Sequence, residues 1–244
     1  MTGSRPARNR AHGAIKLRYQ RRRLRQFISP HLAEGEIAFD IGANVGDWTE
    51  VMSDLGARVV AVEPQVEVAE SLRERFVADP RVSVVRSAVG AAPGTELLHP
   101  AGTATTHSSM SDQWRAVATE HRGVTVWHEP VEVPVTTMDA LIAEFGQPAF
   151  AKVDVEGYEL QVLSGLNTAL DAIAFEFHRE THDELSRCID RIGELGSYRF
   201  ALHVGEWPDR LTGELPPDRA LDRAAALPPG SWGMVVARRT DTTA

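Results

Sequence analysis

FDIGANVG, from Phe39 to Gly46, is the stretch that decides the fold. Its apolar start predicts a buried strand, and its two glycines predict a tight turn that opens a helix. The first turn of such a helix presents unpaired N–H groups and a partial positive charge. Because Gly42 and Gly46 also allow a ligand to approach the backbone closely, this junction is typical of a site for a nucleotide-like cofactor.

Short apolar runs and helical patterns alternate on both sides of this junction. The alternation predicts one α/β domain with a right-handed, doubly wound, mostly parallel sheet of seven strands. A chain of 244 residues can bury such a core. We predict strands at Glu36–Ile41, Arg58–Val62, Val82–Arg86, Ala149–Val153, Ala172–Phe177, Tyr198–Val204 and Gly233–Arg238, and helices at Val45–Leu55, Val66–Phe76, Met138–Phe145, Leu160–Ala169 and Asp183–Leu195.

Two segments depart from this alternation. Residues 93–134 hold weak strand patterns around the polar run TATTHSSMSDQW and are too long for an ordinary connection, so we expect a lid or acceptor-binding insertion there. The last two strands are separated by a stretch rich in Pro, Gly and Asp, which predicts a long mobile excursion. We expect those two strands to pair antiparallel, which adds an antiparallel edge strand to the sheet.

Basic residues are concentrated at the start of the chain. The first 25 residues hold nine basic and no acidic side chains, and since the net charge is −8, the remaining residues carry −17. We interpret residues 1–30 as an Arg-rich helical extension of a domain at 31–244, either solvated or in contact with a second copy in a homodimer. An anionic acceptor, a membrane surface or RNA are alternative partners of the extension, but so acidic a body does not suit nucleic acid.

The composition also indicates where the protein is located and whether disulfides or zinc sites are expected. No apolar run approaches the roughly 18 residues of a membrane span, and the start of the chain lacks the apolar segment of a secretory signal. We therefore expect a cytoplasmic protein without stable membrane insertion. Cys188 is the only cysteine, so no internal disulfide is expected, and no Cys/His cluster has the spacing of a zinc site.

The glycine spacing argues against a dinucleotide. Ala43 and Asn44 follow Gly42, so the middle glycine of the G-x-G-x-x-G fingerprint is missing. Glu63 ends the next strand, seventeen residues after Gly46, where a carboxylate suits both hydroxyls of an unphosphorylated ribose. An NAD-dependent oxidoreductase is one alternative, and the acid disfavours NADP.

The order DIGANVG, VEP, RSAVG, TTMDAL, AKVDVEGYELQVLSGL and AFEFH resembles that of the FkbM family of S-adenosylmethionine-dependent methyltransferases, over roughly residues 37–178. The resemblance implies a Rossmann-like class I methyltransferase fold, with S-adenosylhomocysteine as the product. It implies cofactor contacts as follows: Asp40, Gly42, Asn44 and Gly46 around the methionine and ribose, Glu63 on the ribose hydroxyls, and Ser87 and Ala88 beside the adenine. The acids Asp40, Glu63 and Asp154 suit a cofactor that carries a sulfonium and an ammonium but no phosphate.

Three residues are candidates for the reacting centre. An aliphatic hydroxyl needs a general base or a divalent cation to lose its proton during methyl transfer. Asp154 and Glu176 end neighbouring strands, so we expect their carboxylates to meet and to bind Mg²⁺ or the acceptor. His178 lies two residues beyond Glu176, on the same face of the strand, and is the candidate base. The structural alternatives are that Glu176 pairs with Arg179 and that His178 is a satisfied histidine at the sheet edge. Glu156 is a candidate cap of the helix after the fourth strand, and Lys152 is expected either to snorkel or to pair with Glu156.

The acceptor is predicted to be a hydroxyl of a sugar or oligosaccharide. Hydroxyl donors and flat aromatic rings suit carbohydrate, and the chain offers Thr105, Thr106, His107, Ser108, Ser109, Trp114, Trp127, His128, Trp207 and Trp232. The FkbM resemblance implies O-methylation of sugars, glycans or polyketide-derived hydroxyls. A polyketide or another secondary metabolite is therefore an alternative acceptor, and a non-catalytic domain that keeps the pocket is a further alternative.

Overall fold

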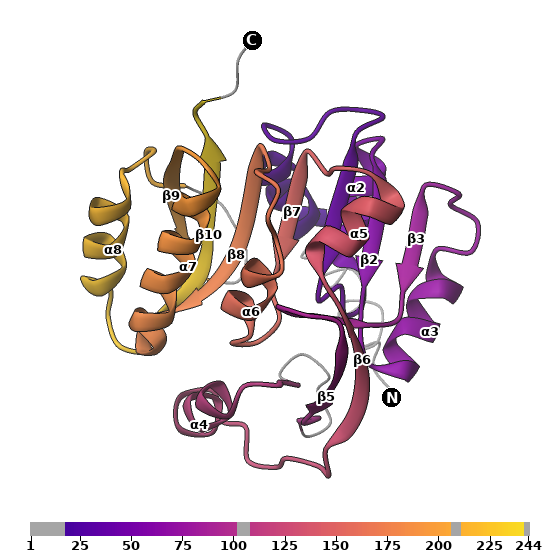
Figure 1. Cartoon of the computed structure of the whole chain (residues 1–244), viewed down its shortest axis with the longest axis horizontal. Helices are drawn as coiled ribbons and strands as arrows, with labels where there is room; N and C mark the ends of the chain where they lie inside the picture. Colours follow the sequence, from indigo (N-terminus) through magenta and orange to yellow (C-terminus); the bar gives the residue numbers. More distant parts are fainter. Residues whose placement is uncertain (1–17, 102–107, 206–210, 242–244) are drawn as a thin grey trace, which may run out of the picture.

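The computed structural model describes residues 18–101, 108–205 and 211–241, and its centre is a seven-stranded sheet (Figure 1). The strands of this sheet are β1 (Ile37–Ile41), β2 (Arg58–Val62), β3 (Val82–Val85), β7 (Phe150–Val153), β8 (Ala172–His178), β9 (Tyr198–Val204) and β10 (Trp232–Arg239). They lie in the order β3-β2-β1-β7-β8-β10-β9. All neighbouring pairs are parallel except the two that β10 makes, with β8 and with β9. The mostly parallel, Rossmann-like sheet predicted from the sequence is confirmed.

The order of the strands marks where a ligand binds. The chain moves outward from β1 through β2 to β3 and later returns to β7 on the other side of β1. The carboxyl ends of β1 and β7 therefore form the topological switch point, where open α/β sheets hold their ligands. At the other end, β9 and β10 pair antiparallel as predicted. The antiparallel strand β10 lies one position in from the edge, which β9 forms.

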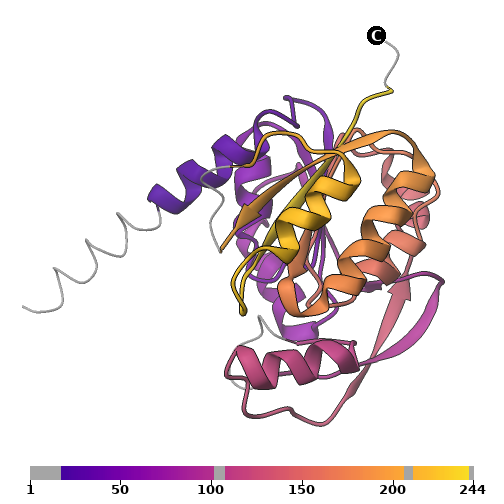
Figure 2. The ribbon, with the colours of Figure 1, turned by 90° about the vertical axis from the view of Figure 1, so that its left-hand side faces the viewer.

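Helices cover both faces of the sheet, because alternate residues of each strand point to opposite sides. One face carries α2 (Asp47–Asp54), α3 (Val66–Arg75) and an N-terminal helix at residues 18–28, and the other carries α5 (Met138–Phe145), α6 (Glu159–Ser164), α7 (His182–Leu195) and α8 (Pro217–Ala225), with a 3-10 turn at Arg179–Thr181 before α7. Figure 2 shows the indigo N-terminal helix on the opposite side of the sheet from α7 and α8. Among the described residues, no helix combines the length and apolarity that crossing a membrane requires.

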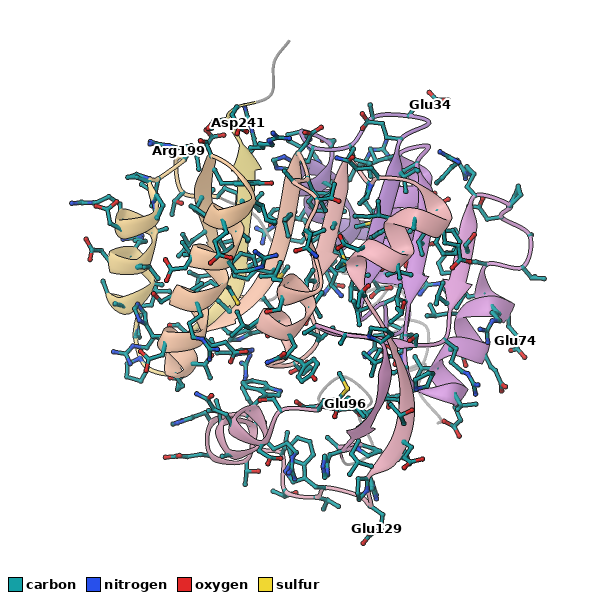
Figure 3. The ribbon with its side chains drawn as sticks, in the orientation of Figure 1. Glu34, Glu74, Glu96, Glu129, Arg199 and Asp241 are labelled. Carbon is teal, nitrogen blue, oxygen red and sulfur yellow. The ribbon has the colours of Figure 1, made fainter. Side chains whose placement is uncertain are left out.

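The insertion predicted at residues 93–134 forms most of a small second unit. A three-stranded sheet of β4 (Ala88–Val89), β5 (Gly94–Leu98) and β6 (Val131–Thr136) is joined by helix α4 (Asp112–His121). This unit lies beyond the carboxyl ends of the parallel strands (Figure 1). Figure 3 places its Glu96 and Glu129 at the end of the molecule opposite Arg199 and Asp241. The insertion is therefore placed to cover the switch point.

Some elements differ from the sequence predictions. Helix α8 occupies the stretch between the last two strands that was predicted as a mobile excursion, and residues 206–210 of that stretch lie outside the described residues. Its buried residues are Ala220 and Ala224. Helix α6 ends at Ser164, five residues before the predicted end. The next residue, Gly165, is its C-cap, and a Cβ there would lie 2.1 Å from the backbone oxygen of Gly90, so only glycine fits at this position.

The described part of the Arg-rich extension packs on the sheet. Leu24, Phe27 and Ile28 are buried in the same apolar cluster as Val51 and Phe150. The basic residues 5, 8, 10 and 16 of the extension lie outside the described residues. The boundary at residue 30 therefore marks a change in composition, while the helix at residues 18–28 contributes side chains to the core.

Replacing Leu24 tests this contribution. Leu24 is 1% exposed, so Leu24→Ala is expected to lower the free energy of unfolding by about 2–5 kcal/mol through lost burial and a cavity. Urea denaturation followed by circular dichroism measures the change. The control Arg22→Ala removes an exposed side chain of the same helix and is expected to change stability by less than about 0.5 kcal/mol. Equal stability of both variants would show that the helix is not part of the folded core.

Candidate active site

The turn after β1 approaches the end of β7 so closely that only glycine fits at its first position. Gly42 has φ +76°, and a Cβ there would lie 1.9 Å from the backbone oxygen of Asp154. The amides of Gly42 and Ala43 both donate to the Val62 carbonyl, at 2.9 and 3.0 Å. Asn44 also has a positive φ, of 47°. These contacts fix the turn between the ends of β1, β2 and β7.

Glu63 faces this turn from the end of β2. Its carboxylate is 3% exposed and accepts hydrogen bonds from the backbone amides of Asn44 and Gln65, each at 3.0 Å. Burial raises the pKa of Glu63, and the amides of Gln65 and Asn44 oppose that rise. The carboxylate is thus held at the place where the sequence predicts ribose recognition, at the end of the strand that follows the glycine turn.

Lys152 ties the ends of β1 and β7 together. Its ammonium is buried and lies 3.3 Å from Asp40 Oδ1 and 3.5 Å from Asp154 Oδ2, and it donates to the Gly42 carbonyl at 2.7 Å. Burial acts to lower the pKa of Lys152, but the charges of Asp154 and Asp40 outweigh it and hold that pKa above its ordinary value. Lys152 therefore pairs with these two acids, and the predicted alternative of a Lys152–Glu156 pair is wrong.

A cavity of 640 Å³ opens above these residues, within the range of small-molecule sites. Seven of the predicted site residues line it, namely Gly42, Asn44, Glu63, Ser87, Ala88, Asp154 and Glu176. Ser87 donates to the Pro134 carbonyl at 2.9 Å and so anchors the wall to the insertion. The donor set fits S-adenosylmethionine, because a glycine turn and buried acids suit a ligand that carries positive charge and no phosphate.

Three predicted site residues lie behind the wall of the cavity. Asp40 is fully buried, where it accepts a hydrogen bond from Thr49 Oγ1 at 2.6 Å and pairs with Lys152. Gly46, with φ +87°, is the N-cap of α2 and packs against α3. His178 is buried behind Glu176. Asp40 and Gly46 can thus shape the turn without touching a ligand in the cavity.

Glu176 and His178 form a buried pair beside the switch point. His178 Nε2 and Glu176 Oε2 lie 3.0 Å apart, without the alignment of a hydrogen bond. Burial, followed by the charges of Asp154 and Glu156, raises the pKa of Glu176 well above its ordinary value. Of the two, only Glu176 lines the cavity. The alternative pairing of Glu176 with Arg179 is absent among the described contacts, since Arg179 donates to the Leu227 carbonyl.

The insertion encloses His178. The ring of Trp114, on α4, lies 3.9 Å from that of His178, and the ring of Trp232 lies 6.4 Å away on a parallel plane. Arg122 Nη2 approaches His178 Nδ1 to 3.5 Å. Trp114 is fully buried, so its ring is part of the core and not a platform for a sugar.

A potential metal-binding group lies next to this pair. Ligand atoms of Glu156, Glu176 and His178 all lie within 4.8 Å of one another. Glu156, predicted as a helix cap or as the partner of Lys152, adopts φ +56° on the loop after β7. Asp154, predicted as a metal ligand together with Glu176, instead contacts Lys152.

The loop that carries Asp154 and Glu156 is held by another buried acid. Glu159 accepts hydrogen bonds from the amides of Val155 and Gly157, at 2.9 and 3.3 Å. Burial raises the pKa of Glu159 to about 8. Glu159 was not among the predicted site residues, although an acid six residues after the end of a strand is the signal that could have revealed it.

The predicted acceptor residues are only partly brought to the cavity. Ser108 and Trp232 line it, and Ser108 Oγ donates to Gln65 Oε1 at 3.1 Å. Thr105, Thr106, His107 and Trp207 lie outside the described residues. The sequence analysis missed His121 and Arg122, which end α4 and also line the cavity. No periodic pattern in the insertion pointed to them.

Comparison with known proteins assigns the chain to a family. A sequence model of the methyltransferase FkbM domain matches residues 40–198, which is well over half of the chain and includes the glycine turn, Lys152 and Glu176. The chain belongs to the FkbM methyltransferase family. The match favours a methyltransferase domain over the alternative of an NAD-dependent oxidoreductase.

A curated relative matches part of this FkbM protein. It is 26% identical over 144 residues to the hexuronic acid methyltransferase AglP of Haloferax volcanii, and the match covers 58% of this chain and 54% of AglP. The chain thus spans about half the length of the curated relative that it matches.

Solved structures overlap with the chain at low scores. Precorrin-6y C5,15-methyltransferase from Geobacter metallireducens gives a TM-score of 0.49 at 10% identity, covering 92% of this chain and 86% of that one. An S-adenosylmethionine-dependent O-methyltransferase from Thermotoga maritima gives 0.41 at 15% identity, covering 90% and 66%. Both TM-scores lie below 0.5, so the family assignment rests on the sequence match.

Substitution of Gly42 tests the turn as a cofactor site. Gly42→Ala is expected to weaken S-adenosylhomocysteine binding at least tenfold, because a left-handed non-glycine residue costs about 1–3 kcal/mol and the new Cβ displaces the end of β7. Isothermal titration calorimetry measures the affinity. The control Gly94→Ala, where a Cβ meets nothing within 4 Å, is expected to bind like the unchanged protein. Unaltered affinity in Gly42→Ala would contradict this placement of the cofactor.

Proposed function

We propose that this protein is an O-methyltransferase that methylates a hydroxyl of a sugar or oligosaccharide. The observation that carries the proposal is Glu176, a buried carboxylate with a raised pKa that lines the cavity beside the glycine turn. A raised pKa makes a carboxylate a stronger base toward the proton of a hydroxyl. The match to a hexuronic acid methyltransferase supports a sugar as the acceptor.

The cofactor is proposed to lie along the ends of β1, β2 and the segment after β3. Glu63 binds the ribose hydroxyls, Gly42 and Asn44 contact the methionine and ribose, and Ser87 with Ala88 flanks the adenine. Asp154 faces the positively charged end, while Asp40 and Gly46 support the turn from behind. When bound, S-adenosylmethionine would supply a methyl group attached to a positively charged sulfur. Transfer of that methyl group to the acceptor oxygen would leave the sulfur as a neutral thioether.

Glu176 is proposed to take the proton of the acceptor hydroxyl. The sequence analysis assigned that role to His178, but His178 is enclosed by Trp114 and does not line the cavity. We therefore assign His178 to orient Glu176 and to stabilise its ionised form from 3.0 Å away.

A hydroxyl of a polyketide or another secondary metabolite is the alternative acceptor. The cytoplasmic location and a homodimer stay predictions.

The roles of Glu176 and His178 are separable by rate and pH profile. Glu176→Gln is expected to lower kcat by about 10²–10⁴, the usual contribution of a positioned base, while His178→Asn lowers it less. Because Glu176 must be ionised to accept a proton, kcat is expected to rise with pH through its raised pKa, and this limb is absent in Glu176→Gln. The assay follows transfer from labelled S-adenosylmethionine to a fractionated glycan and metabolite extract of the host. A greater loss in His178→Asn than in Glu176→Gln would return the role of base to His178.

A metal-assisted reaction is a second candidate, favoured by the group of Glu156, Glu176 and His178. Two carboxylates and an imidazole can hold a divalent cation such as Mg²⁺ or Mn²⁺, which would lower the pKa of the acceptor hydroxyl. In that case dialysis against EDTA abolishes transfer and Mg²⁺ restores it, and Glu156→Gln prevents the restoration. Full transfer after EDTA treatment excludes the metal and leaves Glu176 as the base.

A further inference from the structure

The acceptor side of the cavity carries a cation that the methyl transfer described above does not use. Among the residues that line the cavity, the lysines and arginines are Lys152 and Arg122. The ammonium of Lys152 already forms ion pairs with Asp40 and Asp154 and donates a hydrogen bond to the Gly42 carbonyl. Arg122 comes from the end of α4, on the insertion, and therefore from the wall that faces the cofactor turn.

Arg122 is oriented by aromatic and imidazole contacts and not by an acid. Its guanidinium carbon lies 4.3 Å from the centroid of the Trp232 ring, and Nη2 is 3.5 Å from His178 Nδ1. Within the described part of the chain, no carboxylate forms an ion pair with it. Arg115, on the same helix, contrasts with it, because its guanidinium is paired with Asp112 at 2.5 Å.

A guanidinium placed in this way suits an anion. Stacking on an aromatic ring restricts the planar group and leaves its N–H edge to bind a carboxylate through two parallel hydrogen bonds. Arg122 is only partly exposed, and its nearest acidic influence is the charge of Glu176, which lies beyond ion-pair distance, so a carboxylate in direct contact would stabilise the guanidinium further. The imidazole of His178 lies next to both Arg122 and Glu176, with its Nδ1 3.5 Å from Arg122 Nη2 and its Nε2 3.0 Å from Glu176 Oε2.

We propose that Arg122 binds a carboxylate of the acceptor, so that the substrate is an acidic sugar, and thereby directs a neighbouring hydroxyl to Glu176. This inference rests on the proposed function, since it names the substrate class of the same site. Acids line the cofactor half of the cavity, and Arg122 makes the acceptor half complementary to a negative group. His121, the other basic residue that α4 adds to the wall, lies beside it.

Binding of simple sugars tests Arg122 without knowledge of the full acceptor. Saturation-transfer NMR titrations compare D-glucuronate, D-glucose 6-phosphate and D-glucose on protein loaded with S-adenosylhomocysteine. Glucuronate is expected to bind about tenfold or more tightly than glucose, the usual strength of a charge-assisted bidentate contact, and Arg122→Gln is expected to remove the preference. The matched control Arg115→Gln keeps the preference, and all variants bind S-adenosylhomocysteine with unchanged affinity.

In the titrations with glucuronate and glucose, the inference is overturned by no glucuronate binding, by equal binding of the two sugars, or by a preference that survives Arg122→Gln. Tighter binding of glucose 6-phosphate than of glucuronate contradicts the carboxylate. In the transfer assay, reduction of carboxylates to primary alcohols is expected to inactivate the accepting fraction, whereas a neutral fraction that accepts the label equally well contradicts the inference. If Glu176→Gln abolishes transfer to a neutral sugar, the proposed function stands and the role of Arg122 falls.

Discussion

The buried ammonium of Lys152 is the contact on which the rest of the site depends. It joins Asp40 at the end of β1 to Asp154 just after β7, across the switch point of the sheet. Such a group is costly to bury, and removal of one partner from a buried pair typically costs about 3–5 kcal/mol because it leaves an unpaired charge. The same ammonium donates to the Gly42 carbonyl, so the cofactor turn and the loop after β7 are held as one unit.

This contact also determines which acids are available for chemistry. Asp40 and Asp154 are paired with Lys152, and Glu63 is satisfied by backbone amides. Glu176 is left buried beside an imidazole, with its pKa raised by burial and by neighbouring acids. Environment thus separates carboxylates of similar intrinsic acidity into acids paired with an ammonium, an acid held by backbone amides and a buried acid with a raised pKa, and only the last is proposed as the base. The insertion completes the arrangement by covering His178 with Trp114 and by bringing Arg122 to the opposite wall.

The sequence predicted the sheet well because its signals are local. Strands such as β1 and β2 are continuous apolar runs, and the glycine turn between β1 and α2 has a distinctive spacing. Helices α4 and α8 were missed because few of their residues are buried, and those of α8 are alanines. The pairing of Lys152 depends on contacts more than a hundred residues apart in the chain, which periodicity does not reveal.

The sequence predicted which residues belong to the candidate site better than it predicted the role of each one. The period of two in β8 correctly placed Glu176 and His178 on one face. Which of them reaches the cavity depends on the insertion, whose tertiary position the sequence does not encode in any short pattern. The importance of Arg122 likewise arises only when α4 is folded against Trp232.

A crystal structure of the protein with S-adenosylhomocysteine tests the central claim most directly. The account predicts density for the product at the carboxyl ends of β1 and β2, with both ribose hydroxyls on Glu63, the thioether sulfur directed toward the wall that contains Glu176, and the Lys152 contacts to Asp40 and Asp154 intact. A ligand bound elsewhere, or a cavity that stays empty at saturating product, would contradict it.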